Sequence, residues 1–382
     1  MTHELNDDQR SLPVMRRFAS LDIFRGAIIA AMVVVNNPGD PSHVYSQLAH
    51  AAWHGMTVTD VIAPWFLWVI GVTTSISASR RMEGTSSAVV FGHAVRRGAI
   101  LYVIGLVLVA LPVLVSSASV SWHESIKLMG VLQRIAICYV LGSLLFLLLG
   151  AKGRLSLAIV LLVGYWIIMV WIPGPGEGGG PFDVVGNRAY LFDRQVLGDF
   201  GEGTSHSLLT IPAVTSTVLF GTLAGDVIRG NGTVARKILW LAGGGVVLCV
   251  VGLLVSEWIP INRRIWTPSF VLLTAGLAAV VLAALIWLVD VRRLRQGTGW
   301  MVAYGANPIF LFVLSEAGRV AAGMKGITDS GGQWRSYWTI GYEALLAIAD
   351  PKAASAIVAV AYAGAIGIVA VLMYRKGWII KV

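Results

Sequence analysis

Residues 47–71 read QLAHAAWHGMTVTDVIAPWFLWVIG, and within them a polar cluster passes directly into an apolar run. The run continues far enough to cross about 30 Å of hydrocarbon as a helix. His50, His54 and Asp60 therefore stand at the mouth of a membrane helix, where ionisable side chains are costly and usually face a cavity or a partner. A reaction centre is one interpretation. The other is interfacial anchoring, in which the tryptophans form an aromatic belt and the histidines are merely hydrated.

The whole chain has the composition of a polytopic membrane protein. Its 382 residues are 56% hydrophobic and 13% charged, with a mean hydropathy of +0.75. The charged fraction is about half that of an ordinary soluble domain. The formal charge is +9, but the basic residues fall in short clusters between apolar runs, as topology determinants do, so we expect no nucleic-acid partner. Cys138 and Cys249 lie in different apolar runs, which argues against a disulfide or a cysteine metal site.

Apolar runs long enough to span a bilayer predict an all-α membrane bundle of about ten transmembrane helices. The predicted spans are 20–37, 57–79, 97–117, 127–149, 154–173, 208–228, 235–257, 268–290, 299–320 and 353–374. Residues 1–19 form a cytoplasmic tail before them. Arginine and lysine concentrate on alternate connections, so the positive-inside rule places both termini in the cytoplasm. The loop with His50 is then external, which for a bacterial inner membrane means periplasmic.

A second polar group lies inside the predicted bundle. Gln133 and Arg134 sit about 10 Å deep in the fourth helix, at 1.5 Å per residue. An arginine there requires a carboxylate, a bound anion or a water-filled vestibule. Glu316, on the ninth helix, is one candidate partner, and a purely structural ion pair is the alternative interpretation. Asn307 and Pro308 interrupt that ninth helix.

Several common catalytic and metal-binding motifs are missing from the sequence. It contains no P-loop, no G-x-S-x-G and no H-E-x-x-H. His50 and His54 are four residues apart, but Trp53 and Gly55 argue against a helix that would bring both imidazoles onto one ion. We therefore expect no metal.

A series of short blocks follows in order between about residues 18 and 315. They are SLDIFRG (20–26), MVVVNN (32–37), HAAWHG (50–55) with TVTD (57–60) and PWF (64–66), GVLQR (130–134), TIPA (210–213), INRRIWT (261–267) and YGAN (304–307). Together they resemble the heparan-α-glucosaminide N-acetyltransferase family of transmembrane acyltransferases, in its bacterial branch, some members of which are linked to N-acetylglucosamine use. One block departs: the family's Asp-Pro-Glu-Gly-Leu-Leu stretch is replaced by GTSHSLL at 203–209.

The resemblance implies an acetyltransferase whose transmembrane acyltransferase domain is residues 20–382. It would move an acetyl group from acetyl-CoA, supplied on the cytoplasmic side, to a glucosamine-type amino sugar on the far side. The family's active histidine corresponds to His50, and its asparagine at the end of the first helix corresponds to Asn36. The departure at 203–209 leaves the acceptor open.

The residue types suit this chemistry. A neutral imidazole can take a proton from an attacking amine or attack a thioester itself, so we expect His50 to be a general base or an acetyl carrier. Asp60 would orient His50 and stabilise its cation. Asn36 or Asn37 would donate a hydrogen bond to the developing oxyanion, a role worth on the order of 3 kcal/mol.

The remaining candidates are expected to bind the two substrates. Cytoplasmic arginines suit the CoA phosphates through charge-assisted hydrogen bonds. The expected acetyl-CoA contacts are Arg25, Arg80, Arg97, Gln133 and Arg134, with Arg81 and Arg96 in the same basic clusters. The expected acceptor contacts are Asn37, Trp53, His54, Asn262, Arg263 and Glu316. The lipid bilayer is the third partner, and a homodimer is a reasonable expectation because closed homo-oligomers are common.

Two other functions compete with acetyl transfer. A sugar or small-anion transporter without acyl transfer would also have about ten helices, an interrupted helix and buried polar residues. Paired interrupted helices in two matching halves, which many transporters show, are missing from the sequence. A structural membrane subunit without a reaction leaves His50, Asp60 and Arg134 unexplained.

Overall fold

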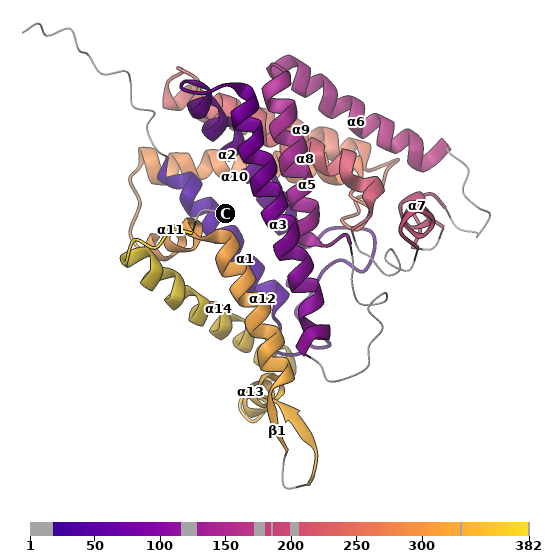
Figure 1. Cartoon of the computed structure of the whole chain (residues 1–382), viewed down its shortest axis with the longest axis vertical. Coiled ribbons are helices and arrows are strands. Elements are labelled where there is room, and N and C mark those ends of the chain that lie inside the picture. The colour runs from indigo at the N-terminus through magenta and orange to yellow at the C-terminus, as the bar shows by residue number, and fades with distance from the viewer. Residues whose placement is uncertain are drawn as a thin grey trace, which may run out of the picture.

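The computed structural model describes residues 18–115, 128–171, 180–184, 186–198, 206–328 and 331–380. Nearly all of the secondary structure in these residues is helical (Figure 1). The longer elements are α1 (Ala19–Asn36), α2 (Ile62–Met82), α3 (Ser87–Val115), α5 (Val131–Leu148), α6 (Ala151–Trp171), α8 (Ile211–Arg229), α9 (Val234–Val255), α10 (Pro268–Leu285), α12 (Pro308–Met324) and α14 (Pro351–Arg375). The shorter ones are η1 (Thr59–Val61), α7 (Arg188–Leu197), η3 (Leu208–Thr210), η4 (Ile286–Val291), α11 (Gly299–Ala306), β1 (Gly326–Thr328), β2 (Trp334–Ser336) and α13 (Tyr337–Leu345).

The predicted spans all correspond to helices. Within the described residues nine helices are long and apolar enough to cross a membrane, and the bent pair α11 and α12 brings the number to ten. That pair turns through 86° at Asn307 and Pro308, which confirms the predicted interruption. The all-α, multi-pass membrane architecture is therefore confirmed.

The largest difference from the predicted spans is at α3. It begins at Ser87, ten residues before the predicted span 97–117. The span predicted from hydropathy starts at Arg97 and leaves out the turns that hold His93 and Arg96, yet these turns continue the helix and direct basic side chains toward a cavity described below. Charge ends an apolar run without ending a helix, since arginine is a good helix former.

The long connections contain elements that the hydrophobic pattern does not reveal. α7 lies between α6 and α8, and a two-stranded antiparallel hairpin of β1 and β2 leads into α13, with Gly326 opposite Ser336. Figure 1 shows this hairpin projecting beyond the bundle below α12 and α13.

Glycines allow the central helices to touch backbone to backbone. A Cβ added at Gly71 of α2 would lie 2.1 Å from the carbonyl oxygen of Val218 on α8, and one at Gly221 would lie 2.0 Å from that of Trp68. Larger residues would force the helices apart. Close packing through small residues is the usual basis of helix association in membranes, where water supplies no hydrophobic drive between helices.

Helix α2 connects the two ends of the bundle that matter for function. The first end, where α1 finishes and α2 begins, holds His50, and we call it the histidine end. At the other end α2 finishes and α3 begins with a group of arginines, and we call it the arginine end. The 21 residues of α2 span about 30 Å, which matches the thickness of a bilayer's hydrocarbon core.

Candidate active site

His50 and Asp60 form a close pair at the histidine end. The Nδ1 atom of His50 lies 2.7 Å from Oδ1 of Asp60. The Asp60 side chain is fully buried, whereas 42% of the His50 side chain is exposed. Asp60 therefore holds an imidazole that substrates can reach. If Nδ1 carries the proton and donates a hydrogen bond to the carboxylate, Nε2 is unprotonated and can act as a base. No other described residue forms a hydrogen bond with Nε2.

Besides its contact with His50, the carboxylate of Asp60 is held by several hydrogen-bond donors. Its Oδ2 accepts hydrogen bonds from the backbone N–H groups of Ala51 (3.1 Å) and Thr57 (3.0 Å) and from the Thr57 hydroxyl (3.1 Å). These residues belong to the non-helical stretch before η1, which confirms that His50 and His54 do not share a helix turn. The buried carboxylate therefore has a fixed position, and the imidazole is oriented by it.

Arg263 supplies the counter-charge for Asp60. Its Nε lies 2.9 Å from Asp60 Oδ1, and its side chain is 15% exposed. Burial lowers the pKa of the Arg263 guanidinium, and the neighbouring Asp60 carboxylate acts in the opposite direction. Arg263 thus balances the buried negative charge, and the same carboxylate orients His50 and is placed to stabilise its cation.

Residues 260–267, between α9 and α10, form the loop that brings Arg263 to this place. The Asn262 side-chain oxygen accepts the backbone N–H groups of Arg264 (2.8 Å) and Ile265 (3.1 Å). The Tyr165 hydroxyl of α6 donates to the Ile265 carbonyl at 2.6 Å. The loop is thus braced from within and from a neighbouring helix.

Trp266 is the strained residue of this loop. Its φ angle is +49°, in the left-handed region that residues with a side chain rarely adopt, and it is completely buried. Such strain persists only where the surrounding structure enforces it, and it concentrates at functional sites. Here the strain places the indole under the Arg134 guanidinium, 4.3 Å from the ring centroid.

The 260–267 loop also touches the segment around His50 directly. The Gly55 N–H donates to the Ile261 carbonyl at 2.8 Å, and the Asn262 amide nitrogen lies 3.4 Å from His54 Nδ1. The Arg264 guanidinium lies 5.9 Å from the ring centroid of Trp53. Loop and segment therefore form one unit, so His50, Asp60 and Arg134 are positioned together.

Arg134 is buried without an ion-pair partner among the described residues. Its guanidinium stacks on Trp266, and its Nη1 has no hydrogen-bond partner, nor does Nε2 of the adjacent Gln133. Glu316, one candidate partner for Arg134, does not pair with it. Glu316 instead accepts a hydrogen bond from the Asn36 amide at 3.2 Å, because Arg134 turns toward the loop rather than toward α12. Donors left unsatisfied in a buried site are suited to a ligand's carbonyl or anionic groups.

The two asparagines at the end of α1 do not bond to His50. The exposed Asn36 contacts Glu316. Asn37 is buried and donates to its own helix, at the Val33 carbonyl (2.8 Å). Trp53 is anchored through its indole N–H to the Phe182 carbonyl at 2.7 Å.

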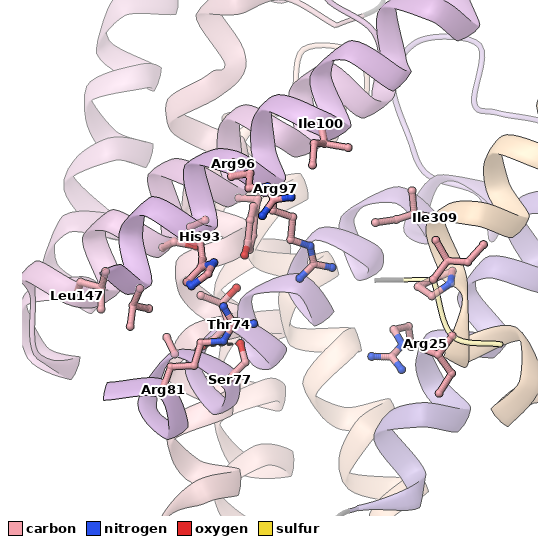
Figure 2. Close-up of a pocket in the computed structure, with 18 of the residues that line it drawn as sticks. Arg25, Thr74, Ser77, Arg81, His93, Arg96, Arg97, Ile100, Leu147 and Ile309 are labelled. Atoms are coloured by element: carbon pink, nitrogen blue, oxygen red, sulfur yellow. Dashed lines mark hydrogen bonds between the residues drawn. The ribbon is translucent and has the colours of Figure 1, made fainter. Parts of the chain in front are cut away.

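A basic cavity of about 410 Å³ opens at the arginine end (Figure 2). It is lined by Arg25, Arg81, Arg96, Arg97 and His93, together with the polar side chains of Thr74, Ser77, Tyr139 and Ser143. Figure 2 shows Arg25 of α1, Arg81 of α2, and His93, Arg96 and Arg97 of α3 around this cavity. Four arginines around one cavity form a site for a polyanion.

The expected basic residues divide around this cavity. Arg25 and Arg97 line it, but Arg80 does not, and Arg81 takes its place. Successive helix residues are rotated by about 100°, so the two neighbours on α2 face different directions. Arg25 is held in position by the Gly305 carbonyl at 2.8 Å and by Asp22 at 3.0 Å. Asp22 and Arg25 are three residues apart in α1, so both side chains lie on one face of the helix.

A second cavity of about 250 Å³ follows the first along the same helices. α3, α5 and α12 line both cavities. The arginine-end cavity reaches Ile100 on α3, and the second begins five residues on, at Gly105, and contains Gln133 and Glu316. The two cavities therefore lie in sequence from the arginine end toward the depth of Gln133.

The C-terminal segment forms part of the cavity wall, and the sequence did not indicate this. The Asn307 side chain donates to the Trp378 carbonyl (2.8 Å) and accepts the Ile380 N–H (2.7 Å). Ile379 and Ile380 thereby line the arginine-end cavity. His93 was also missed, although its spacing of three and four from Arg96 and Arg97 would have placed it on their face had α3 been extended.

Part of this chain is similar to a family model and to two named proteins. Residues 17–176, which include His50, Asp60 and Arg134, match the family model "Heparan-alpha-glucosaminide N-acetyltransferase, catalytic". The human heparan-alpha-glucosaminide N-acetyltransferase is 29% identical, with 78% of this chain and 52% of the relative covered. The mouse protein of the same name is 28% identical, with 78% and 53% covered. The chain spans about half the length of these relatives, and its similarity to the heparan-alpha-glucosaminide N-acetyltransferase family model covers residues 17–176.

Proposed function

We propose that this protein is a membrane acetyltransferase that moves an acetyl group from acetyl-CoA to a glucosamine-type amino sugar. The main support is the placement of an oriented imidazole and a polyarginine cavity at opposite ends of the same helices, with a second cavity between them. The names of the human and mouse relatives describe N-acetylation of a glucosaminide. In this proposal the arginine end binds the donor and the histidine end binds the acceptor.

The CoA phosphates would bind in the arginine-end cavity. Arg81, Arg96 and Arg97 supply positive charge there, and arginine's fork geometry suits phosphate oxygens. By the positive-inside rule this end is cytoplasmic, where acetyl-CoA is made. The His50 loop then faces the opposite compartment, the periplasm if the membrane is a bacterial inner membrane.

The pantetheine arm would extend through the second cavity toward Gln133 and Arg134. The unpartnered Nε2 of Gln133 and Nη1 of Arg134 are donors that suit the arm's amide carbonyls or the thioester oxygen. Because Arg134 stacks on the same loop that holds Arg263 beside Asp60, a thioester bound there lies close to the histidine unit.

The reaction would use His50 as the base. Nε2 takes a proton as the sugar amine attacks the thioester carbonyl, so that the new C–N bond forms and the C–S bond breaks. The departing thiolate receives the proton from the imidazolium. In the two-step variant Nε2 itself attacks the carbonyl, and the C–S bond breaks to release the CoA thiolate. The amine then attacks acetyl-histidine, the bond from the acetyl carbon to Nε2 breaks, and the proton that the amine loses neutralises the thiolate. Asp60 stabilises the cation in both routes.

The test uses purified protein in nanodiscs supplied with acetyl-CoA and glucosamine. Free CoA thiol and N-acetylglucosamine are measured together. His50→Ala should lower both rates by about 10²- to 10⁴-fold. His43→Ala is the matched control because His43 lies in the same connection and also pairs with an aspartate, yet it should keep the wild-type rate. Equal CoA release by wild type and His50→Ala, with sugar present, would refute the enzyme.

A transporter without acyl transfer gives the opposite result. Labelled glucosamine would then enter proteoliposomes without acetyl-CoA. Dependence of any sugar modification on acetyl-CoA, together with loss in His50→Ala, separates the two functions.

A further inference from the structure

An apolar groove of about 400 Å³ lies between α6 and α9. α6 packs on α8 and α9 packs on α10, so the two outer helices flank a channel whose floor includes Phe220 and Leu272. Every lining residue is hydrophobic. Figure 1 shows α6 at the upper right of the bundle, with α9 labelled to its left.

The groove is open to the lipid phase along its length. Ile159 and Val163 on α6 are 50% and 47% exposed, and Val251 on α9 is 39% exposed. The α6 wall runs from Leu155 to Trp166, about 17 Å at 1.5 Å per residue. That is close to half the roughly 30 Å of bilayer hydrocarbon, the depth of one leaflet. A single hydrocarbon chain from one leaflet matches the groove in length and chemistry.

One end of the groove lies at the active-site loop. Ile259 and Pro268 both line the groove, and they bracket residues 260–267. On the α6 wall, Trp166 lines the groove while its neighbour Tyr165 donates to the Ile265 carbonyl. A chain in the groove therefore ends beside the loop that holds Arg263 against Asp60.

This end also has the features of a membrane surface. Trp171 at the end of α6 is 73% exposed and Trp258 just after α9 is 77% exposed, as tryptophans at a bilayer interface are. Arg264 is exposed in the same loop, over the ring of Trp53. A cation at the head of a hydrocarbon groove matches a lipid phosphate.

We propose that the groove between α6 and α9 binds the hydrocarbon tail of a lipid-linked amino sugar, with the lipid's phosphate at Arg264 and its sugar at His50. This rests on the proposed acetyl transfer and specifies the class of its acceptor. The groove holds the tail in one leaflet while the sugar remains at the interface, so an acceptor that diffuses within the membrane would reach His50 without leaving it.

The test compares two acceptors in nanodiscs. One is methyl glucosaminide, and the other is glucosamine 1-phosphate esterified to a hexadecyl chain with a terminal diazirine. Val163→Trp fills the groove, and Val160→Trp is the control because Val160 is 63% exposed on the same helix outside the lining. Arg264→Ala removes the proposed phosphate contact.

Two readouts are expected to agree. Irradiation without acetyl-CoA should label groove residues of α6 and α9 in wild type and in Val160→Trp, and Val163→Trp should lose about nine tenths of that labelling. The ratio of kcat/KM for the lipid acceptor to that for methyl glucosaminide should fall about tenfold in Val163→Trp and in Arg264→Ala. If the ratio is unchanged in these variants, or if labelling is spread equally over all lipid-facing helices, the proposal that the groove binds the lipid tail is overturned.

The outcomes separate the two proposals. Groove labelling with acetylation of neither acceptor refutes acetyl transfer and leaves the lipid site. Acetylation of methyl glucosaminide with no groove labelling refutes the lipid site and leaves the enzyme. Dimers cross-linked through Val163→Cys would show that a second copy of the chain covers the groove, and this too overturns the lipid site.

Discussion

Two histidine–aspartate pairs lie in the connection between α1 and α2, and their heavy-atom distances are the same. His43 Nδ1 lies 2.7 Å from Asp40 Oδ2, and His50 Nδ1 lies 2.7 Å from Asp60 Oδ1. Their surroundings differ. The Asp40 side chain is 26% exposed, whereas that of Asp60 is fully buried and also pairs with Arg263.

The difference shows that hydrogen-bond length does not identify a catalytic pair. An exposed ion pair is worth about 0–1 kcal/mol because water screens it. A buried carboxylate with fixed donors cannot relax, so it can hold an imidazole in one orientation throughout a reaction. The predictions below test this contrast between buried groups with fixed partners and exposed groups.

Replacement of Asp60 should have the largest effect. In Asp60→Asn the amide can no longer stabilise an imidazolium or balance Arg263, so we expect kcat/KM for glucosamine to fall about 10³-fold. Asp40→Asn is the control and should stay close to wild type. If both substitutions reduce turnover equally, burial is not what distinguishes the pairs.

Removal of Arg263 should destabilise the protein. Arg263→Ala leaves the buried Asp60 without its counter-charge, which should lower the unfolding free energy by about 3 kcal/mol. The exposed pair of Arg335 and Glu343, also 2.9 Å long, offers the comparison, and Arg335→Ala should cost less than about 1 kcal/mol. Thermal unfolding in detergent would measure both, and similar losses would contradict the contrast.

A similar contrast separates an arginine of α3 that lines the arginine-end cavity from an arginine of α2 that does not. Arg97→Ala, inside the arginine-end cavity, should raise KM for acetyl-CoA about tenfold, since one charge-assisted phosphate contact is lost. Arg80→Ala, outside the cavity lining, should leave KM unchanged. Steady-state kinetics with varied acetyl-CoA decides this, and equal effects would place the phosphates elsewhere.

A smaller effect is expected where Asn307 holds the C-terminal segment. Asn307→Ala should release Trp378 to Ile380 from the cavity wall and raise KM for acetyl-CoA about threefold. Ile380→Gly, which keeps Asn307 intact and removes only a lining side chain, should shift KM in the same direction. Unchanged KM in both variants would show that the segment does not contact the donor.

The smallest expected effect is the pH-dependent stabilisation by the exposed pair of His43 and Asp40. The hydrogen bond from His43 holds the pKa of Asp40 below its ordinary value of 3.8. A carboxylate whose folded pKa is depressed stabilises the fold above the unfolded pKa, and that contribution is lost as pH falls through the folded pKa. Asp40→Asn should therefore lower Tm by no more than about 2 °C at pH 7, and the difference should begin to shrink near pH 4 and vanish only below the depressed pKa of folded Asp40. A larger shift at pH 7 would show that Asp40 is more than a surface pair.

Much of the local arrangement could be predicted from the sequence. The positions of the helices followed from apolar runs, and the contacts of Asp22 with Arg25 and of His50 with Asp60 join residues close in the chain. The partners of Arg134 and Arg263 could not be predicted. Arg134 contacts an indole whose left-handed backbone is enforced by its surroundings, and Arg263 pairs with a carboxylate on a distant helix.

The sequence by itself determined a multi-pass helical membrane protein, because hydrocarbon requires every backbone polar group to be bonded within its own helix and so ties each span to a local run of apolar residues. It also marked the polar stretch at His50. Only the tertiary structure decided that the 260–267 loop joins His50, Asp60 and Arg134, that Arg81 rather than Arg80 lines the arginine-end cavity, and that the C-terminal segment forms part of its wall. These depend on how helices rotate and which distant segments meet, and packing of the whole bundle sets both.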